Sequence, residues 1–434
     1  MGILRRAARV LPTGTGVVGV WVAISGVLAY VFLAVTGRAL GAHEASGLST
    51  LWISGFLVGN AAGMPVEQEV ARAIASRRAQ ALGVGPVIRR AAIASGFFGV
   101  AVAVCIAVAG APLVRNLFGG NWVLLGALIV LFLGTMAEYL VRGVLAGLGR
   151  FAAYGRLLGA EAAVRVVAVI GLAAAGVSQA SPYGVVLALA PFVGIAAAVG
   201  LGDRALIRSG GPVVPWRELT RSLGWLLGAA VFAQALVNLG PLFVRLLAHR
   251  DAALTSAFVA SLIVARVPVF LFQAAQAALI PRLSHHAGGG RAERLAAETK
   301  ALARALLVFV IVATIGAALL GPVVVRIGWG DDFALGARDF ALLAAASGAY
   351  LLAVTFASAL VALERPHHAT AGWFVGFITF MTCVVVGRDV LTRVEVGFLI
   401  GAVAAATVLG GLARHGFRQS IARESIPENE RGGR

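Results

Sequence analysis

The sequence predicts an all-α polytopic membrane protein of about twelve transmembrane helices in two parallel six-helix lobes. Apolar residues make up 60% of the 434 positions and charged residues only 13%, whereas a soluble domain has about a quarter of its residues charged. The stretches between the charges run for about 20 residues, the length of helix that crosses a hydrocarbon core about 30 Å thick. The short alternating segments of a membrane β-barrel are not seen. A repeat at half the chain length divides the helices into two sets.

The apolar spans can be placed one by one along the chain. They cover approximately residues 15–36, 47–70, 91–114, 121–148, 153–177, 183–202, 222–247, 253–281, 302–326, 337–362, 368–387 and 394–413. The first span follows a basic segment but is too long for the apolar region of a signal peptide. The polar stretches between the spans are far too short to form a soluble domain.

The basic residues are distributed unevenly between the two sides of the predicted bundle. The chain has 36 Lys and Arg against 19 Asp and Glu, and only Lys300 among the 36 is a lysine, a usage typical of GC-rich bacterial genomes. If the spans alternate in direction, 25 of the 36 fall on the side that holds both termini, 8 on the other side and 3 within spans. Because basic loops stay in the cytoplasm, we expect a multi-pass protein of the bacterial cytoplasmic membrane with both termini in the cytoplasm.

An internal duplication is visible at half the chain length. Residues 144–151 (VLAGLGRF) and 359–366 (ALVALERP) lie 215 positions apart, and Pro65 and Pro281 lie 216 apart. Six spans per half give the two halves the same orientation in the membrane. We therefore expect an N-terminal lobe of residues 1–210, a C-terminal lobe of residues 211–413 and a cytoplasmic tail of residues 414–434.

Patterned glycines indicate where helices approach closely. Gly55, Gly59 and Gly63 form a ridge of small residues on the second span, and Gly143 and Gly147 repeat the pattern on the fourth. Such ridges let helix backbones pack tightly in lipid. Close packing is the expected role, and bending during a transport cycle is the alternative.

Ionisable residues inside the membrane are costly and mark a pathway or a paired network. The fourth and fifth spans carry Glu138, Arg142, Glu161 and Arg165, with each acid four residues before its base. This spacing favours an ion pair within each helix. Glu138 and Arg165 are equally far from the turn at 149–154, as are Arg142 and Glu161, so each Glu should lie level with an Arg of the neighbouring helix. We expect a neutral four-member charge lattice facing the bundle interior, either as a structural clamp or as one wall of a substrate cavity.

Arg266 differs because no carboxylate stands at helical spacing from it. It lies within the eighth span, with Pro268 just after it and Gln273 on the same face, and the proline should kink the helix. An unpaired Arg at this depth suits bidentate binding of phosphate. The alternative is an ion pair with Glu138 or Glu161 from the other half.

Further polar residues share helix faces with possible cavity positions. Gln234, Asn238 and Arg245 lie on one face of the seventh span, and Asn60 and Glu67 on one face of the second. Arg245 is close enough to the outer end of its span to extend to the membrane surface. The other four are candidate cavity residues or hydrogen-bond partners between helices.

Several chemistries find no support in the sequence. It has no Walker A motif, and His285–His286 and His367–His368 lack a third ligand at metal spacing. Asp331–Asp332 lacks the pattern of a calcium loop, and no Ser–His or Cys–His nucleophile can be argued from spacing. We expect no catalytic residue, metal or cofactor.

Three segments resemble a known family. RGVLAGLGRFAAYG (142–155), ALIPRLS (278–284) and TGRALGAHEASG (36–47) are similar to the corresponding segments of the polysaccharide and lipid-linked oligosaccharide flippases. These proteins belong to the multidrug/oligosaccharidyl-lipid/polysaccharide exporter superfamily. The resemblance covers essentially the whole chain, and it rests on packing and loop patterns.

The resemblance implies a V-shaped pair of lobes around a cavity that opens alternately to each side. The implied substrate is a polyprenyl-diphosphate-linked sugar, moved from the cytoplasmic to the outer leaflet, with Arg266, Arg142 and Arg165 meeting the diphosphate. The implied partners are this lipid-linked sugar, membrane lipid and glycan-assembly enzymes. Nucleic acid is not expected as a partner, and the protein is expected to be a monomer and not an enzyme.

Two other functions stay open. A proton- or sodium-coupled multidrug antiporter of the same superfamily would use cavity carboxylates, for which Glu138 and Glu161 are available. A membrane enzyme or scaffold of cell-envelope glycan assembly is the third possibility. An enzyme of this kind would need a large outer loop with catalytic residues, and every predicted outer loop is short.

Overall fold

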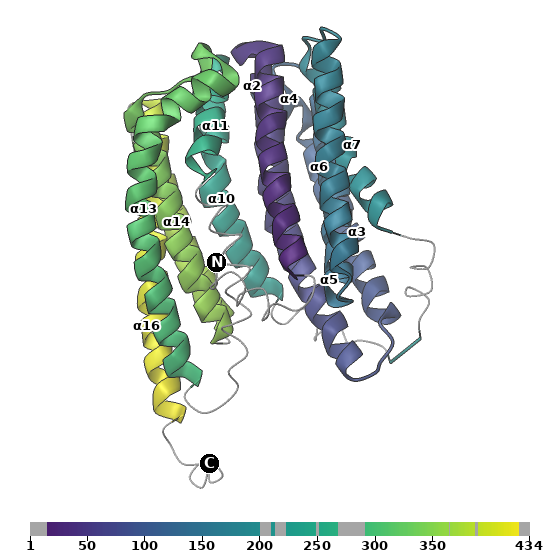
Figure 1. Ribbon diagram of the computed structural model, residues 1–434, viewed down its shortest axis with the longest axis vertical. Helices are drawn as coiled ribbons and strands as arrows, with labels where there is room; N and C mark the ends of the chain where they lie inside the picture. Colours follow the sequence, from purple (N-terminus) through teal and green to yellow (C-terminus); the bar gives the residue numbers. More distant parts are fainter. Residues whose placement is uncertain are drawn as a thin grey trace, which may run out of the picture.

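The computed structural model describes residues 15–199, 210–212, 223–248, 251–267, 291–363, 365–386 and 389–424. These residues form helices and short connections, and no strand occurs among them. Within them, ten helices are long and apolar enough to cross a membrane by length and composition. Figure 1 shows the helices running roughly side by side in two groups. The predicted all-α membrane fold with two lobes is confirmed.

The N-terminal group begins with α2, which contains the first two predicted spans. α2 covers Thr15–Ala79 and consists of two helices that meet at Gly41, where the chain reverses. Gly41 has φ 70° and ψ 168°, a conformation open essentially to glycine alone. The remaining helices of this group are α3 (Gly85–Val108), α4 (Gly110–Leu117), α5 (Trp122–Gly147), α6 (Phe151–Ala174) and α7 (Ala180–Ala198).

The C-terminal group supplies the other six spans. It consists of α10 (Leu223–Leu247), α11 (Ala252–Ala265), α13 (Arg291–Trp329), the 3-10 turn η1 (Asp331–Phe333), α14 (Ala337–Ala362), α15 (Pro366–Val386) and α16 (Val390–Glu424). α11 covers the first half of the predicted eighth span, whose second half lies outside the described residues. With α2 counted as two spans, each of the twelve predicted spans has a helix.

Some helices extend beyond their predicted spans. α13 begins at Arg291 and not near 302, and α16 continues to Glu424 and not to about 413. The added turns carry most of the charges of these helices, such as Arg294 and Arg418. Hydropathy detects only the apolar part of a helix, whereas the backbone hydrogen bonds continue into water.

The helix boundaries repeat with the offset found in the sequence. α5 and α14 begin 215 residues apart, at Trp122 and Ala337, and also end 215 apart, at Gly147 and Ala362. α6 and α15, which begin at Phe151 and Pro366, show the same offset at their starts. Pro281, the partner predicted for Pro65, lies outside the described residues. The repeat therefore reflects two halves with matching helix positions.

The predicted glycine ridges are packing surfaces between α2 and α5. A Cβ added at Gly63 would lie 2.1 Å from Tyr139 Cδ2, and one at Gly59 would lie 2.8 Å from Thr135 Cγ2. On α5, a Cβ at Gly143 would lie 2.8 Å from the backbone oxygen of Glu67. No side chain fits between the two helices at these positions, which brings the polar face of α2 against the charged face of α5.

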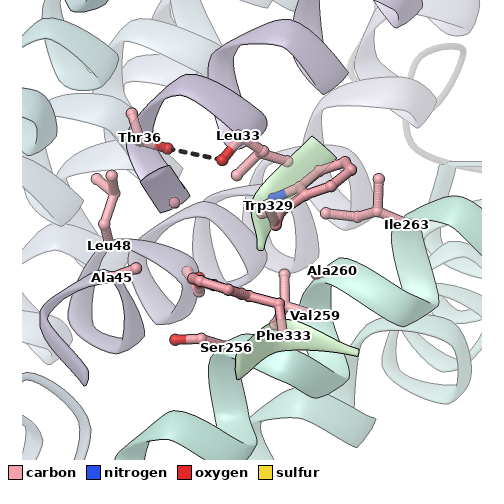
Figure 2. A pocket seen from close by; sticks show the side chains of 12 residues that line it. Leu33, Thr36, Ala45, Leu48, Ser256, Val259, Ala260, Ile263, Trp329 and Phe333 are labelled. Carbon is pink, nitrogen blue, oxygen red and sulfur yellow. Dashed lines mark hydrogen bonds between the residues drawn. The ribbon is translucent and has the colours of Figure 1, made fainter. Parts of the chain in front are cut away.

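The two lobes contact each other at the end of the bundle where α2 reverses, which we call the Gly41 end (Figure 1). Trp329 and Phe333, from the C-terminal lobe, pack there beside Leu33 of α2 and Ile263 of α11 (Figure 2). The space left between these side chains is about 10 Å³, roughly the volume needed to hold one water molecule. The seam between the lobes is therefore tightly packed at this end.

Hydrogen bonds join the lobes along the same seam. Ser256 Oγ donates to the carbonyl oxygen of Ala42 at 2.6 Å, and Arg38 Nε donates to that of Gly328 at 2.8 Å. Tyr30 Oη, deeper in the bundle, donates to Ile263 O at 3.0 Å. Below this level a cavity separates the lobes.

Candidate functional site

A cavity of about 280 Å³ lies between the lobes, on the side of the seam away from the Gly41 end. Its walls come from both halves of α2, from α5 and α6, and from α10 and α11. Seven of the ten predicted site residues line it, namely Asn60, Glu138, Arg142, Glu161, Arg165, Asn238 and Arg266. Sequence spacing had assigned these residues to different helices, and the fold brings them to one space.

The N-terminal wall carries paired charges. Arg165 Nη2 lies 3.2 Å from Glu161 Oε1, and Arg142 Nη1 lies 3.6 Å from Glu138 Oε1. These are the two pairs at a spacing of four residues that the sequence predicted. Glu138 is only 4% exposed and Arg165 9%, so both pairs are held away from bulk water.

The four charges line one cavity as predicted, but the cluster differs from the expected neutral lattice of four in two respects. Neither Glu138 with Arg165 nor Arg142 with Glu161 is among the ion pairs of the described residues. The second difference is a fifth member, because Glu67 Oε2 of α2 lies 3.0 Å from Arg142 Nη2. The cluster therefore contains three carboxylates and two guanidinium groups, so it has one formal negative charge in excess.

Two tyrosines that the sequence analysis missed complete this wall. Arg142 Nε donates to Tyr154 Oη at 2.9 Å, and Tyr154 Oη donates to Glu67 Oε1 at 2.7 Å. The guanidinium carbon of Arg142 also lies 4.4 Å from the ring centroid of Tyr139, a cation–π contact. Tyr139 Oη donates to Asn60 Oδ1 of α2. Tyr139 stands three residues before Arg142, and that helical spacing was the available signal.

The C-terminal wall carries Arg266. α11 ends at Ala265, and Arg266 is its C-cap. Pro268, at which the sequence predicted a kink, lies outside the described residues. Arg266 Nη1 donates to Asn238 Oδ1 of α10 at 3.2 Å, and its Nη2 donates to the carbonyl oxygen of Val237. Arg266 Nε is buried and has no hydrogen-bond partner among the described residues.

Arg266 makes no ion pair with a carboxylate of the described residues. The predicted alternative, a pair with Glu138 or Glu161, is therefore not formed, although all three residues line the same cavity. Neutral oxygens hold the guanidinium in place without neutralising its charge. Nε has no acceptor among the described residues, and Nη1 and Nη2 each carry a second N–H besides the one that these bonds use.

The other predicted residues have supporting positions. Asn238 Nδ2 donates to Gln234 Oε1 at 2.8 Å, so the two share one face of α10 as predicted, and Gln234 stands behind Asn238. Glu67 reaches the cavity wall through Arg142. Gln273 lies outside the described residues.

The cavity therefore has opposite charges on its two sides. The N-terminal wall has an excess carboxylate, and the C-terminal wall has a cation held only by neutral groups of the described residues. A polar ligand with one anionic group would be oriented by this arrangement, with its anionic group toward Arg266. Arg142 and Arg165 are already bound to carboxylates and have less to offer an anion.

Solved structures with this arrangement of helices are transporters. An inward-facing multidrug-resistance MATE family transporter of the MOP superfamily superposes with a TM-score of 0.70 at 14% sequence identity, covering 92% of this chain and 96% of that chain. An outward-facing structure of such a transporter gives 0.62 at 13% identity, covering 96% and 99%. The MATE transporter ClbM in complex with Rb⁺ gives 0.60 at 16% identity, covering 93% and 94%.

Sequence comparison adds relatives but no family assignment. Two curated proteins of Mycobacterium tuberculosis, the uncharacterized proteins MT1558/MT1560 and Rv1510, are each 28% identical over 331 residues, which is 74% of this chain and 73% of theirs. No protein-family model matches the chain. The structural likeness shows that the chain has the fold of these MATE transporters.

Proposed function

We propose that this protein is a flippase or exporter that moves a polyprenyl-diphosphate-linked oligosaccharide or polysaccharide precursor across the cytoplasmic membrane by alternating access. The observation that carries the proposal is Arg266, a cation at the central cavity with a free Nε donor and no carboxylate partner among the described residues. The segments similar to lipid-linked sugar flippases, at 142–155 and 36–47, give it further support.

The chemistry of Arg266 fits a diphosphate. A guanidinium offers two parallel donors to the oxygens of a phosphate group, and such charge-assisted bonds are about twice as strong as neutral ones. Asn238 and Val237 O hold the side chain in place from one edge, so little freedom is lost on binding. The bound diphosphate would neutralise a charge that the described residues leave unpaired.

The opposite wall fits a sugar. Glu138, Glu161 and Asn60 line it and offer acceptors and an amide to the hydroxyl groups of a glycan. The excess carboxylate would keep the diphosphate away from this wall and so orient the substrate. The polyprenyl chain would stay in the lipid beside the lobes.

Orientation and organisation belong to the same proposal. The proposed organisation has an N-terminal lobe at 1–210, a C-terminal lobe at 211–413 and a tail at 414–434. If both termini lie in the cytoplasm, the Gly41 end faces the outside of the cell. The closed seam is then at the outer face, and the structure is inward-facing, in keeping with the higher TM-score against the inward-facing transporter. The proposed setting is a bacterial cytoplasmic membrane, with the protein a monomer beside glycan-assembly enzymes.

Reconstitution tests the substrate. The purified protein in proteoliposomes should speed the movement of a fluorescent polyprenyl-diphosphate sugar between leaflets, measured by bleaching of the accessible dye. Arg266→Gln should lower the initial rate about tenfold or more, because each hydrogen bond to a charged group is worth about 1.5–3 kcal/mol. The transport rate of Arg266→Lys should lie between those of the unmodified protein and Arg266→Gln, since lysine keeps the positive charge but cannot make the bidentate contact of a guanidinium.

Arg304→Gln is the matched control, since Arg304 is exposed on α13 and away from the cavity. It should transport at the unmodified rate. Unchanged transport by Arg266→Gln, or no acceleration of a lipid-linked sugar by the unmodified protein, would contradict the flippase proposal. In the native cell, deletion of the gene should make lipid-linked sugars accumulate in the cytoplasmic leaflet.

A proton- or sodium-coupled antiporter for small molecules is the second candidate. Glu67 favours it, because it gives the N-terminal wall one carboxylate more than the two arginines can neutralise. A cation could bind there in exchange for a cationic drug. In this case efflux of a cationic dye from proteoliposomes should depend on a proton or sodium gradient, and Glu67→Gln should abolish that dependence. Dye efflux that is independent of both the proton gradient and the sodium gradient would exclude this candidate.

A further inference from the structure

A second and larger cavity lies at the Gly41 end, apart from the central one. Its volume is about 710 Å³, within the range of small-molecule sites. The side chains around it are mainly polar or charged, among them His43, Glu44, Arg115, Asn116, Asn121 and Arg245. The proposed transport function assigns no role to this space.

Arg245 lines this cavity near the outer end of its predicted span. It reaches from α10 across the lobe boundary, where its Nη1 donates to Ser46 Oγ of α2 at 3.1 Å. Its Nε is buried without a hydrogen-bond partner among the described residues. A Cβ placed on Gly119, which has φ 59°, would lie 3.6 Å from Arg245 Nη2, so the glycine loop lies directly against the guanidinium.

Arg115 supplies a second positive charge from the other lobe. It lies in the last turn of α4, is exposed, and lines the same cavity. Glu44 also lines the cavity, but neither arginine forms an ion pair with a carboxylate of the described residues. The walls therefore carry two guanidinium groups and one carboxylate, and neither guanidinium is paired with a carboxylate of the described residues. This excess of positive charge favours binding of an anion.

Position and size indicate the kind of anion. Trp122, the residue after Asn121, begins α5 and is 61% exposed, and Trp in this setting marks the interface between membrane and water. Phosphate groups of lipids lie at that level. The guanidinium fork matches phosphate, and the volume leaves room for the alcohol attached to it.

We propose that this cavity binds a phosphate group, borne by a lipid headgroup or free in solution, between Arg115 of the N-terminal lobe and Arg245 of the C-terminal lobe. The site is separate from the central cavity and does not require the substrate proposed above. Because its two cations belong to different lobes, the bound phosphate bridges them and stabilises the contact at the Gly41 end.

Binding to the purified full-length protein tests the proposal. In dodecyl maltoside micelles, which contain no phosphate, calorimetric titration with sodium phosphate and sodium pyrophosphate should show binding at constant ionic strength. Arg115→Gln and Arg245→Gln should each weaken it at least about tenfold, since each removes one charged donor group. Arg326→Gln, at an exposed arginine of the same end that does not line the cavity, should bind as the unmodified protein does.

The lipid source is distinguished by a second arm, in which nanodiscs contain phosphatidylglycerol. If the soluble anions do not bind but phosphatidylglycerol raises the unfolding temperature, and Arg115→Gln removes the rise, the phosphate belongs to a lipid. Arg115 is exposed, so this variant decides the matter even if Arg245→Gln does not fold. Absence of binding in both arms, or an equal loss in Arg326→Gln, would overturn the proposal.

Discussion

At the scale of single residues, Arg142 connects more members of the charged wall than any other residue described there. It contacts Glu67 and Glu138 as ion pairs, donates to Tyr154, and stacks on Tyr139. Two of the three carboxylates of the cluster therefore depend on one cation. Removing that cation should cost more than removing either acid, because each acid would then be left buried and unpaired.

We predict that Arg142→Ala lowers the free energy of unfolding by about 3–5 kcal/mol, the cost of leaving buried ion-pair partners unpaired. The double variant Arg142→Gln with Glu67→Gln should recover part of this loss, because it removes a positive and a negative charge together. Thermal unfolding of the purified variants in detergent measures both the loss in the single variant and the recovery in the double variant. A single variant as stable as the unmodified protein would show that the cluster does not contribute to folding.

The sequence predicted part of this cluster and not the rest, for a definite reason. Glu138, Arg142, Glu161 and Arg165 could be placed because helical spacing and distance from a tight turn determine depth and face. Glu67 could not be paired with Arg142, since the contact depends on how α2 packs against α5, and spacing along the chain does not contain that information.

At the scale of helices, glycine determines how closely α2 and α5 approach, and so whether Glu67 reaches Arg142. Gly143 of α5 faces the backbone of Glu67 itself. The sequence predicted this ridge correctly because the spacing of small residues is a local property. It could not predict which helix the ridge would face.

We predict that Gly143→Ala destabilises the protein by about 1–3 kcal/mol, the usual cost of overpacking. The added Cβ would lie 2.8 Å from a backbone oxygen, so a helix must move and the Glu67–Arg142 pair must lengthen. Gly126→Ala on the same helix is the control, since nothing lies within 4 Å of a Cβ there, and Ala favours helix over Gly. The measurement is thermal unfolding, and equal effects of the two variants would contradict the packing argument.

At the scale of the whole molecule, the sequence predicted the two halves but not how they meet. The offset of 215 residues recurs at both ends of α5 and α14 and at the starts of α6 and α15. The contacts between the lobes, such as Ser256 with Ala42 and Arg38 with Gly328, join residues more than 200 positions apart. Neither hydropathy nor helical spacing indicates such contacts.

The closed seam gives alternating access a direct test. If the lobes separate at the Gly41 end in each cycle, the contact between Ala42 and Ser256 must break, since Ser256 Oγ lies 2.6 Å from Ala42 O. We predict that Ala42→Cys with Ser256→Cys, joined by a short, reducible thiol cross-linker after Cys105 and Cys383 are replaced by Ser, stops transport, and that reductant restores it. The control pair is Gly228→Cys with Thr370→Cys, both in the C-terminal lobe and adjacent, because a Cβ at Gly228 would lie 3.0 Å from Thr370 Cγ2.

Cross-linking within one lobe leaves rigid-body movement free, so the control should transport at its uncross-linked rate. Comparing the two cross-linked proteins shows whether transport stops because the lobes cannot part or because the reagent damages the protein. Full transport by the protein cross-linked at Ala42 and Ser256 would mean that substrate passes without the lobes parting at this end. In that case substrate would have to reach the central cavity by another route, and the proposal that Arg266 orients substrate during an alternating-access cycle would be contradicted.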